Sequence, residues 1–154
     1  SSTPSKIGDV SNAYMPGVWD GLFIGNGGNA ILDNMTISNA SSCLSVYGDL
    51  EAKNLELSNC LLGLDLHGEA TVSMFTANHT GAYGIRNTGN LSINNSEFAQ
   101  TTIGIYSTGT LLADTLSFSN VGIGIDAESG ISEVENVEVE NVSTAFPLFV
   151  TENE

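Results

Sequence analysis

Residues 116–130 read LSFSNVGIGIDAESG, and residues 55–68 read LELSNCLLGLDLHG. Both stretches place hydrophobic residues at alternate positions, and both contain a Ser-Asn pair and a glycine followed by an aliphatic residue. Alternation of apolar and polar residues is typical of β-strands, because successive side chains point to opposite faces. The similarity of the two stretches predicts an internal repeat made of strands.

One position of this repeat can be followed along the chain at steps of 22, 20, 21, 20, 20 and 21 residues. A period this regular is typical of a solenoid. No repeat shows a helical 3.6-residue pattern, and glycine or asparagine interrupts each repeat at short intervals. We therefore expect an all-β parallel β-helix of about six to seven coils of 20–22 residues over residues 17–150. Residues 1–16 would be an N-terminal extension or cap, and residues 151–154 a C-terminal tail. The repeated position, called the reference position below, is occupied by Gly21, Cys43, Gly63, Gly84, Gly104, Gly124 and Ala145.

Two columns of residues after the reference position are expected to point into the solenoid. The first is aliphatic or aromatic throughout, and the second is apolar at both ends but polar or small in the middle. Buried Asn87 and Ser107 would need hydrogen-bond partners. The first column is Leu22, Leu44, Leu64, Ile85, Ile105, Ile125 and Phe146. The second column is Ile24, Val46, Leu66, Asn87, Ser107, Ala127 and Leu148.

Asparagines recur at one corner of the coil, at Asn39, Asn59, Asn120 and Asn141. Asparagine tolerates the left-handed backbone conformation that a tight corner requires, and its amide can hydrogen-bond the next coil. Asn78 lies near the corner of its own coil, where we expect His79 to lie in a longer loop. Gln100 replaces asparagine in the following coil.

The coil length, the asparagine corner and the W-x-G-L-x-I motif at residues 19–24 resemble the right-handed parallel β-helix of the pectate-lyase-like superfamily. The resemblance covers residues 17–150 and is greatest to repeat regions of archaeal and bacterial surface proteins. It implies a right-handed coil, and in enzymes of this kind the chemistry lies on the outward face of one sheet. The same scaffold carries lyases, hydrolases and adhesins, so the resemblance does not choose among them.

Composition excludes several classes of partner. Eighteen acidic residues against three basic ones give a net charge of −15, which disfavours nucleic acid and anionic membrane surfaces. No apolar run is long enough to insert into a membrane. The acidic surface has two interpretations, solubility in salty surroundings or cation binding.

Four glutamates lie close together in the last repeat, at Glu133, Glu135, Glu138 and Glu140. They form either a solvated strand face or a weak Ca²⁺-binding surface. We expect no further cofactor or metal.

Two features favour an extracellular location. Cys43 and Cys60 are either two buried thiols or one disulfide of an exported protein. The chain has few lysines and six sequons for N-linked glycosylation. Sequons alone are weak evidence for glycosylation here, because many arise by chance in a chain so rich in asparagine and serine. The sequon asparagines are Asn34, Asn39, Asn78, Asn90, Asn94 and Asn141.

Two outward rows carry the candidate ligand patch, Asp65, His67, Arg86, Tyr106, Asp126 and Glu128. Asp65 beside Arg86 is expected to form a cross-strand ion pair of little energetic value. Asp126 and Glu128 would lie about 7 Å apart, inside the roughly 6.5–9.5 Å range of inverting glycosidases, but adjacent exposed acids are common in so acidic a chain. The four polygalacturonase motifs are absent and the turns are short, so we expect no catalytic residue. The complete rows are Phe23, Ser45, Asp65, Arg86, Tyr106, Asp126 and Pro147, then Tyr47, His67, Thr88, Thr108, Glu128 and Phe149.

These patterns predict a non-catalytic, extracellular β-helix module of a cell-surface or filament-forming adhesion protein. No amphipathic helix covers either end of the solenoid, so we expect either neighbouring domains of a longer chain or head-to-tail self-association. The alternative is a carbohydrate-binding or polysaccharide-degrading module with Phe23, Tyr47 and Tyr106 as aromatic anchors.

Overall fold

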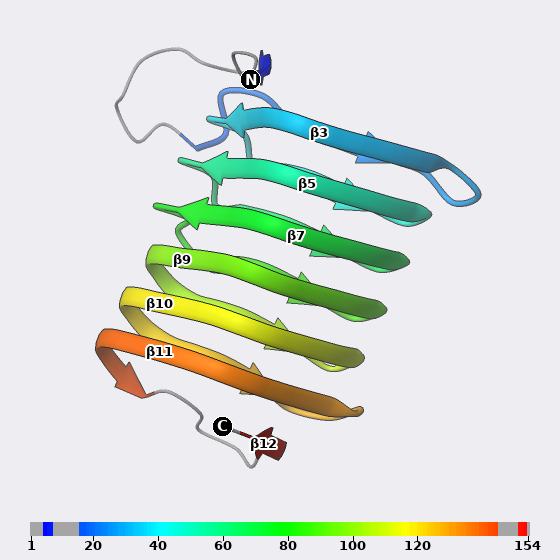
Figure 1. Ribbon diagram of the computed structural model, residues 1–154. Helices are drawn as coiled ribbons and strands as arrows, with labels where there is room; N and C mark the ends of the chain where they lie inside the picture. The colour runs from blue at the N-terminus through cyan, green and yellow to red at the C-terminus, as the bar shows by residue number, and fades with distance from the viewer. Residues whose placement is uncertain (1–4, 8–15, 145–150, 154) are drawn as a thin grey trace.

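A computed structural model describes residues 5–7, 16–144 and 151–153, and it is a parallel β-solenoid of about six turns (Figure 1). The described residues contain no helix, and therefore none long and apolar enough to cross a membrane. All strands belong to one hydrogen-bonded sheet that winds around the core. They are β1 (Ser5–Ile7), β2 (Leu22–Ile24), β3 (Asn29–Ser38), β4 (Ser42–Val46), β5 (Asp49–Ser58), β6 (Leu62–Leu66), β7 (Glu69–Asn78), β8 (Tyr83–Asn87), β9 (Asn90–Ser107), β10 (Thr110–Ala127), β11 (Ser132–Thr144) and β12 (Thr151–Asn153).

The pairing register confirms the predicted repeat. Leu44 pairs in parallel with Leu22 and Leu64, and the same column continues through Ile85, Ile105 and Ile125. The side chains of this column from Leu44 to Ile125 are fully buried. Phe146, Leu148 and the reference residue Ala145 lie outside the described residues.

The expected extension and tail both contribute to the sheet. β1 pairs with β3 at Met35–Ile37, and β12 pairs with β11 at Glu133–Glu135. Each segment therefore adds a short parallel strand at one end of the stack, and Figure 1 shows the long strands β3, β5, β7, β9, β10 and β11 between them.

The predicted corner is a column of left-handed residues. Its φ values lie between 54° and 64°, as asparagine permits. His79 is the corner residue of its coil, with a φ of 59°, and Asn78 precedes it. The expectation that His79 lies in a longer loop is confirmed, because residues 79–82 connect β7 to β8, one residue more than residues 59–61 between β5 and β6. The amide of Asn141 donates to Oδ1 of Asn120 at 2.6 Å, as a stacked asparagine ladder requires. The column is Asn39, Asn59, His79, Gln100, Asn120 and Asn141.

A second left-handed column lies inside the long strands and bends each of them midway. Its φ values lie between 52° and 62°. Side chains alternate between the core and solvent on either side of the bend, but two successive residues face outward at the bend itself. The inward positions therefore step by three there, from Ala52 to Leu55 and from Val72 to Phe75. The column is Asn34, Asn54, Met74, Asn95, Thr115 and Asn136.

Large and small core residues exchange places between neighbouring coils. Phe75 shares its coil with Ala77, whereas the next coil places Ser96 beside Phe75 and Phe98 beside Ala77. Phe98 stacks on Phe118 with ring centroids 5.1 Å apart, and its centroid lies 5.7 Å from that of Phe75. Ser96 is buried but satisfied, since its hydroxyl accepts from the Phe75 N–H at 3.1 Å and donates to the Asn94 carbonyl at 2.9 Å. The core is therefore filled without an unpaired polar group at this point.

Glycine at the reference position makes room for this aromatic stack. A methyl group on Gly84 would lie 2.7 Å from the ring of Phe98 and 2.7 Å from the carbonyl oxygen of Gly104. A methyl group on Gly104 would likewise lie 2.5 Å from the ring of Phe118 and 2.6 Å from the carbonyl oxygen of Gly124. The Gly-aliphatic pair of the repeat is thus a packing requirement.

The predicted buried polar pair is satisfied. The Asn87 amide donates to the Ser107 hydroxyl at 3.1 Å and to the Thr110 carbonyl at 2.8 Å. Its carbonyl oxygen accepts from the Gly89 N–H at 3.0 Å. Asn87 therefore ties the end of one coil to the start of a later strand, which compensates for its burial.

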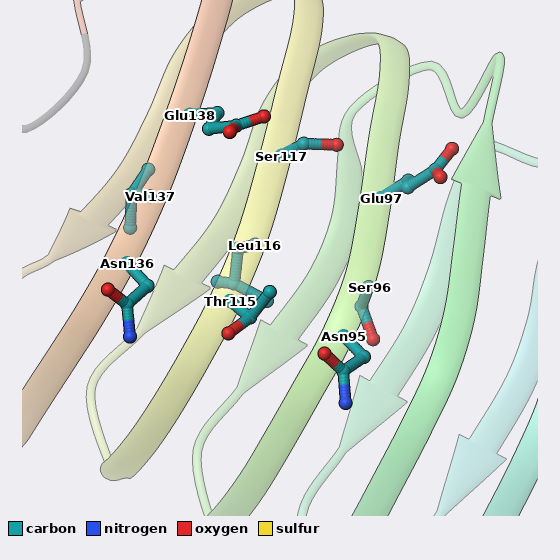
Figure 2. A pocket seen from close by; sticks show the side chains of 9 residues that line it. All are labelled: Asn95, Ser96, Glu97, Thr115, Leu116, Ser117, Asn136, Val137 and Glu138. Atoms are coloured by element: carbon teal, nitrogen blue, oxygen red, sulfur yellow. The ribbon is translucent and has the colours of Figure 1, made fainter.

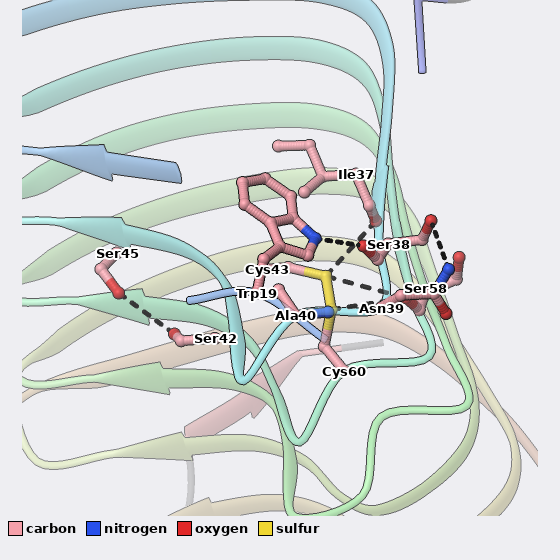
Figure 3. The surroundings of a disulfide bond; sticks show 10 residues. All are labelled: Trp19, Ile37, Ser38, Asn39, Ala40, Ser42, Cys43, Ser45, Ser58 and Cys60. Carbon is pink, nitrogen blue, oxygen red and sulfur yellow. Dashed lines mark hydrogen bonds between the residues drawn. A yellow bond between two sulfur atoms is a disulfide. The ribbon is translucent and has the colours of Figure 1, made fainter. Parts of the chain in front are cut away.

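A disulfide joins Cys43 to Cys60 with their Cα atoms 5.8 Å apart (Figure 3). Both cysteines are fully buried. The backbone N–H of Ala40 points at Sγ of Cys60 from 3.4 Å, and the nearby Trp19 indole donates to the Ser38 carbonyl at 2.8 Å. The bond closes one coil onto itself near the N-terminal end of the stack.

Candidate functional site

The outward face of β2, β4, β6, β8 and the ends of β9 and β10 carries the predicted patch. Register places Asp65 beside Arg86, Arg86 beside Tyr106, and Tyr106 beside Asp126. The second row continues the ladder, because the N–H groups of His67, Thr88 and Glu128 bond to the preceding coil. Pro147 and Phe149, at the end of the two rows, lie outside the described residues.

Asp65 is the most connected residue of the patch. Arg86 donates to it in a bidentate manner, from Nε to Oδ1 and from Nη2 to Oδ2, both at 3.0 Å. Nε2 of His67 lies 3.2 Å from Oδ1, and the Asp65 side chain is only 11% exposed. Burial raises the pKa of Asp65, but the hydrogen bonds and charges of Arg86 and His67 outweigh it, so the net pKa is lowered. The expected ion pair between Asp65 and Arg86 therefore forms, with His67 as a third member.

His67 connects this ion pair to two further side chains. Its ring stacks on Tyr47 with centroids 4.2 Å apart and an angle of 8° between the planes. Its Nδ1 lies 3.1 Å from Oγ1 of Thr88. Asp65, His67 and Thr88 thus follow the carboxylate, imidazole, hydroxyl order of nucleophilic hydrolases.

The surroundings of Thr88 do not complete such a catalytic site. An acyl-transfer site needs N–H donors aimed at the developing oxyanion. The Thr88 N–H donates to the Leu66 carbonyl at 2.9 Å, and the Gly89 N–H donates to Asn87. The Thr88 hydroxyl also lies 3.3 Å from the Leu66 carbonyl, which competes with His67 for its proton. Neither of these two N–H groups is available, and Thr88 is held in the strand ladder.

Aromatic residues lie on both sides of the ion pair along the solenoid axis. Phe23 and Tyr47 have ring centroids 5.4 Å apart and are 64% and 42% exposed. On the other side Tyr83, which the sequence pattern did not indicate, packs against Tyr106 with centroids 5.4 Å apart. Tyr83 belongs to the same AYGIRN stretch as Arg86, but its neighbours in register are the aliphatic Leu62 and Ile103, so its position in the repeat has no aromatic pattern.

Asp126 and Glu128 are brought together at the C-terminal side of the patch. A hydrogen bond from Glu128 to Asp126, together with the charge of Asp126, raises the pKa of Glu128. Glu128 is exposed, so its carboxyl group is in contact with water. This pair lies one coil beyond Tyr106 and makes no ion pair within the described part of the chain.

The hollows found among the described residues lie away from this patch. The one in Figure 2 has a volume of about 560 Å³ and follows the midway bend of β9, β10 and β11. Figure 2 shows Glu97, Ser117 and Glu138 side by side on its rim, one from each strand. Several polar groups around it are engaged, since Asp114 accepts from Asn136 at 2.8 Å and from Thr115 at 3.0 Å. Within residues 16–144, no three His, Cys, Asp or Glu side chains lie close enough to hold a metal ion.

Comparison of the chain with protein families, with curated proteins and with solved structures finds no match in any of the three.

Proposed function

We propose that the chain is a non-catalytic, extracellular β-helix module of a cell-surface or filament-forming adhesion protein, in which it acts as a rigid spacer. The observation that carries the proposal is the outward patch. Asp65 is engaged by Arg86 and His67, and His67 by Tyr47 and Thr88, so these groups bind one another across neighbouring coils. Side chains used in this way stiffen the outer face of a rod.

Two further observations support this assignment. The Cys43–Cys60 disulfide is of the kind that persists in oxidising, exported surroundings. The net charge of −15 keeps an exposed rod soluble. Membership of the pectate-lyase-like superfamily, and of its archaeal and bacterial surface proteins, is part of the same proposal and rests on the sequence resemblance.

The partner of such a module would be a neighbouring domain or a second copy stacked head to tail. Support comes from the last described coil, where Val139 of an inward column is 49% exposed and Ile131 is 64% exposed. Sedimentation across a wide concentration range tests the second copy. A strict monomer at the highest concentration refutes self-association and leaves the neighbouring domain.

Stretching single molecules by their two ends tests the spacer function. A coil of about 20 residues spans roughly 68 Å when extended and about 5 Å when folded, so each coil should release about 63 Å in one step. The 17-residue loop between Cys43 and Cys60 should stay closed, and its extra extension of about 50 Å should appear only after reduction.

Smooth extension at low force, without steps of this size, would refute a mechanical role. The Cys43→Ala/Cys60→Ala variant is the matched control, because it should release the disulfide-closed length without reductant. In parallel, incubation with acidic polysaccharides should produce no unsaturated uronate. Cleavage that is lost in Asp126→Asn or Glu128→Gln would contradict the non-catalytic assignment.

A carbohydrate-binding module is the second candidate function. It is favoured by the exposed rings of Phe23 and Tyr47, which lie on the same face as Tyr106. A glycan array would show binding that Tyr106→Ala weakens and the neighbouring Thr108→Ala does not. Absence of binding at millimolar sugar would remove this candidate.

A further inference from the structure

The folded coil distinguishes among the six sequons, because a glycan needs an asparagine amide that points to solvent. Asn39 is fully buried. In the Asn78 sequon, the hydroxyl of Thr80 is 1% exposed and bonds to Thr101 at 2.7 Å. In the Asn94 sequon, Ser96 is 3% exposed and bonds to Phe75 and Asn94. In these three sequons either the asparagine or the third residue is enclosed by the fold.

Two of the remaining sequons lie at left-handed bends. Asn34 has a φ of 58° and is half-buried. Asn141 has a φ of 57°, and its amide nitrogen, the atom that a glycan would occupy, donates to Asn120 at 2.6 Å. A glycan on Asn141 would therefore have to replace a hydrogen bond of the corner ladder.

Asn90 differs from all of these. It is the exposed first residue of β9, and its backbone N–H donates to the Gly68 carbonyl at 2.9 Å, which fixes its position. Its side-chain amide has no hydrogen-bond partner among the described residues, and its neighbours in register are Glu69 and Thr110. Ser92, the hydroxyl residue of this sequon, is partly exposed.

The surface beside Asn90 suits a sugar. Asn90, Ser92 and Thr110 line a hollow of about 340 Å³, and Leu112 in the same hollow is 43% exposed. The polar groups offer hydrogen bonds to sugar hydroxyls, and the leucine offers apolar surface to a sugar ring. A first sugar here would cover part of the exposed Leu112 side chain.

We propose that Asn90 is an N-glycosylation site of this protein and that Asn39 is not. In the reaction a bond forms between Nδ2 of Asn90 and C1 of the first sugar. The bond from C1 to the diphosphate oxygen of a polyprenyl-linked oligosaccharide donor breaks, the amide loses one proton, and the polyprenyl diphosphate leaves. The inference rests on the extracellular location within the proposed function, since such donors serve exported chains.

Peptide mapping of the full chain, secreted from cultured mammalian cells behind a signal sequence, tests the site. Enzymatic release of glycans in ¹⁸O-labelled water marks each occupied asparagine as a labelled aspartate. We expect the label at Asn90 and none at Asn39. Asn90→Gln and Ser92→Ala should each lower the intact mass by one glycan, whereas the neighbouring Thr110→Ala should not.

An empty Asn90 in the secreted protein refutes the site, whether or not other sequons are occupied. Occupied Asn39 in the folded, secreted protein refutes the exclusion. Stretching of single molecules is to be done on protein made in bacteria without glycans, so failure of the glycan proposal and failure of the spacer proposal are recorded separately.

Discussion

The disulfide between Cys43 and Cys60 gives the most quantitative prediction. It closes a loop of 17 residues, so removal of the bond acts mainly by freeing the unfolded chain. Both cysteines are fully buried, so replacing them also removes two sulfur atoms from the core. In the loop-entropy relation, a loop of this length lowers the entropy of the unfolded chain enough to stabilise the fold by about 3 kcal/mol. Cys43→Ala/Cys60→Ala should therefore lower the free energy of unfolding by about 3 kcal/mol.

Urea unfolding followed by circular dichroism measures this difference. Wild-type protein unfolded and refolded in reductant is the matched control, because it loses the same bond but keeps both sulfur atoms. The reduced protein and the double variant should agree within about 1 kcal/mol, and the thermal midpoint should fall by about 6–12 °C in each. Reductant should leave the double variant unchanged.

If the free energy of unfolding fell by less than about 1 kcal/mol in both the double variant and the reduced protein, the loop-entropy reasoning would be refuted. It would mean that the unfolded chain already holds this coil together, or that the coil unfolds separately from the rest of the stack. A large loss in the variant but none on reduction would assign the effect to core packing, because reduction removes no atoms from the core.

Three further predictions follow from the core, the bends and the acidic pair. Met74→Asn should raise stability by about 0.5–1 kcal/mol, since Met74 is 50% exposed with a φ of 53°; a lower thermal midpoint would contradict this. Phe98→Ala should cost about 3–5 kcal/mol in urea unfolding, whereas Leu61→Ala, at a 51% exposed position, should cost about 0.5 kcal/mol or less; equal losses would refute the core assignment. Asp126→Asn should lower the pKa of Glu128 toward its ordinary range in a carboxyl-carbon NMR titration, because the acceptor charge is removed; an unchanged pKa would show that Asp126 is not the cause.

The inward columns and the main corner could be predicted from sequence because both repeat with little variation. The column that contains Leu64 and Ile85 is aliphatic from residue 22 to residue 125, and Asn59 and Asn120 share a residue type suited to the left-handed conformation. In the third coil the corner falls on His79 and not on Asn78 beside it, and residue type alone could not decide between them, because asparagine and histidine are both enriched in the left-handed conformation.

The midway bend was missed for a different reason. The bend shifts the apolar alternation by one residue, from Ala52 to Leu55 and from Val72 to Phe75, and a pattern followed only within a short stretch does not reveal such a shift. The column itself has asparagine in four of its six described positions, but Met74 and Thr115 are unusual left-handed residues and obscure it.

Spacing along the sequence placed Asp65 beside Arg86, and the structure contains that ion pair. It did not place His67 against both Tyr47 and Asp65, because these contacts depend on side-chain rotamers. Rotamers are set by the neighbours that pack around a side chain, and a repeat alignment gives backbone positions only.

Every pairing between complete coils joins residues only 20–22 positions apart, as with Leu22 and Leu44 or Asn90 and Thr110. The growing structure therefore closes one short loop at a time, and the entropy of that closure, about 2.7 kcal/mol in its length-dependent part, is nearly the same for each coil. No late step has to bring distant parts of the chain together. Folding should therefore start wherever two coils first meet and proceed outward, with the oxidised coil at Cys43–Cys60 as the favoured nucleus because its loop is already closed.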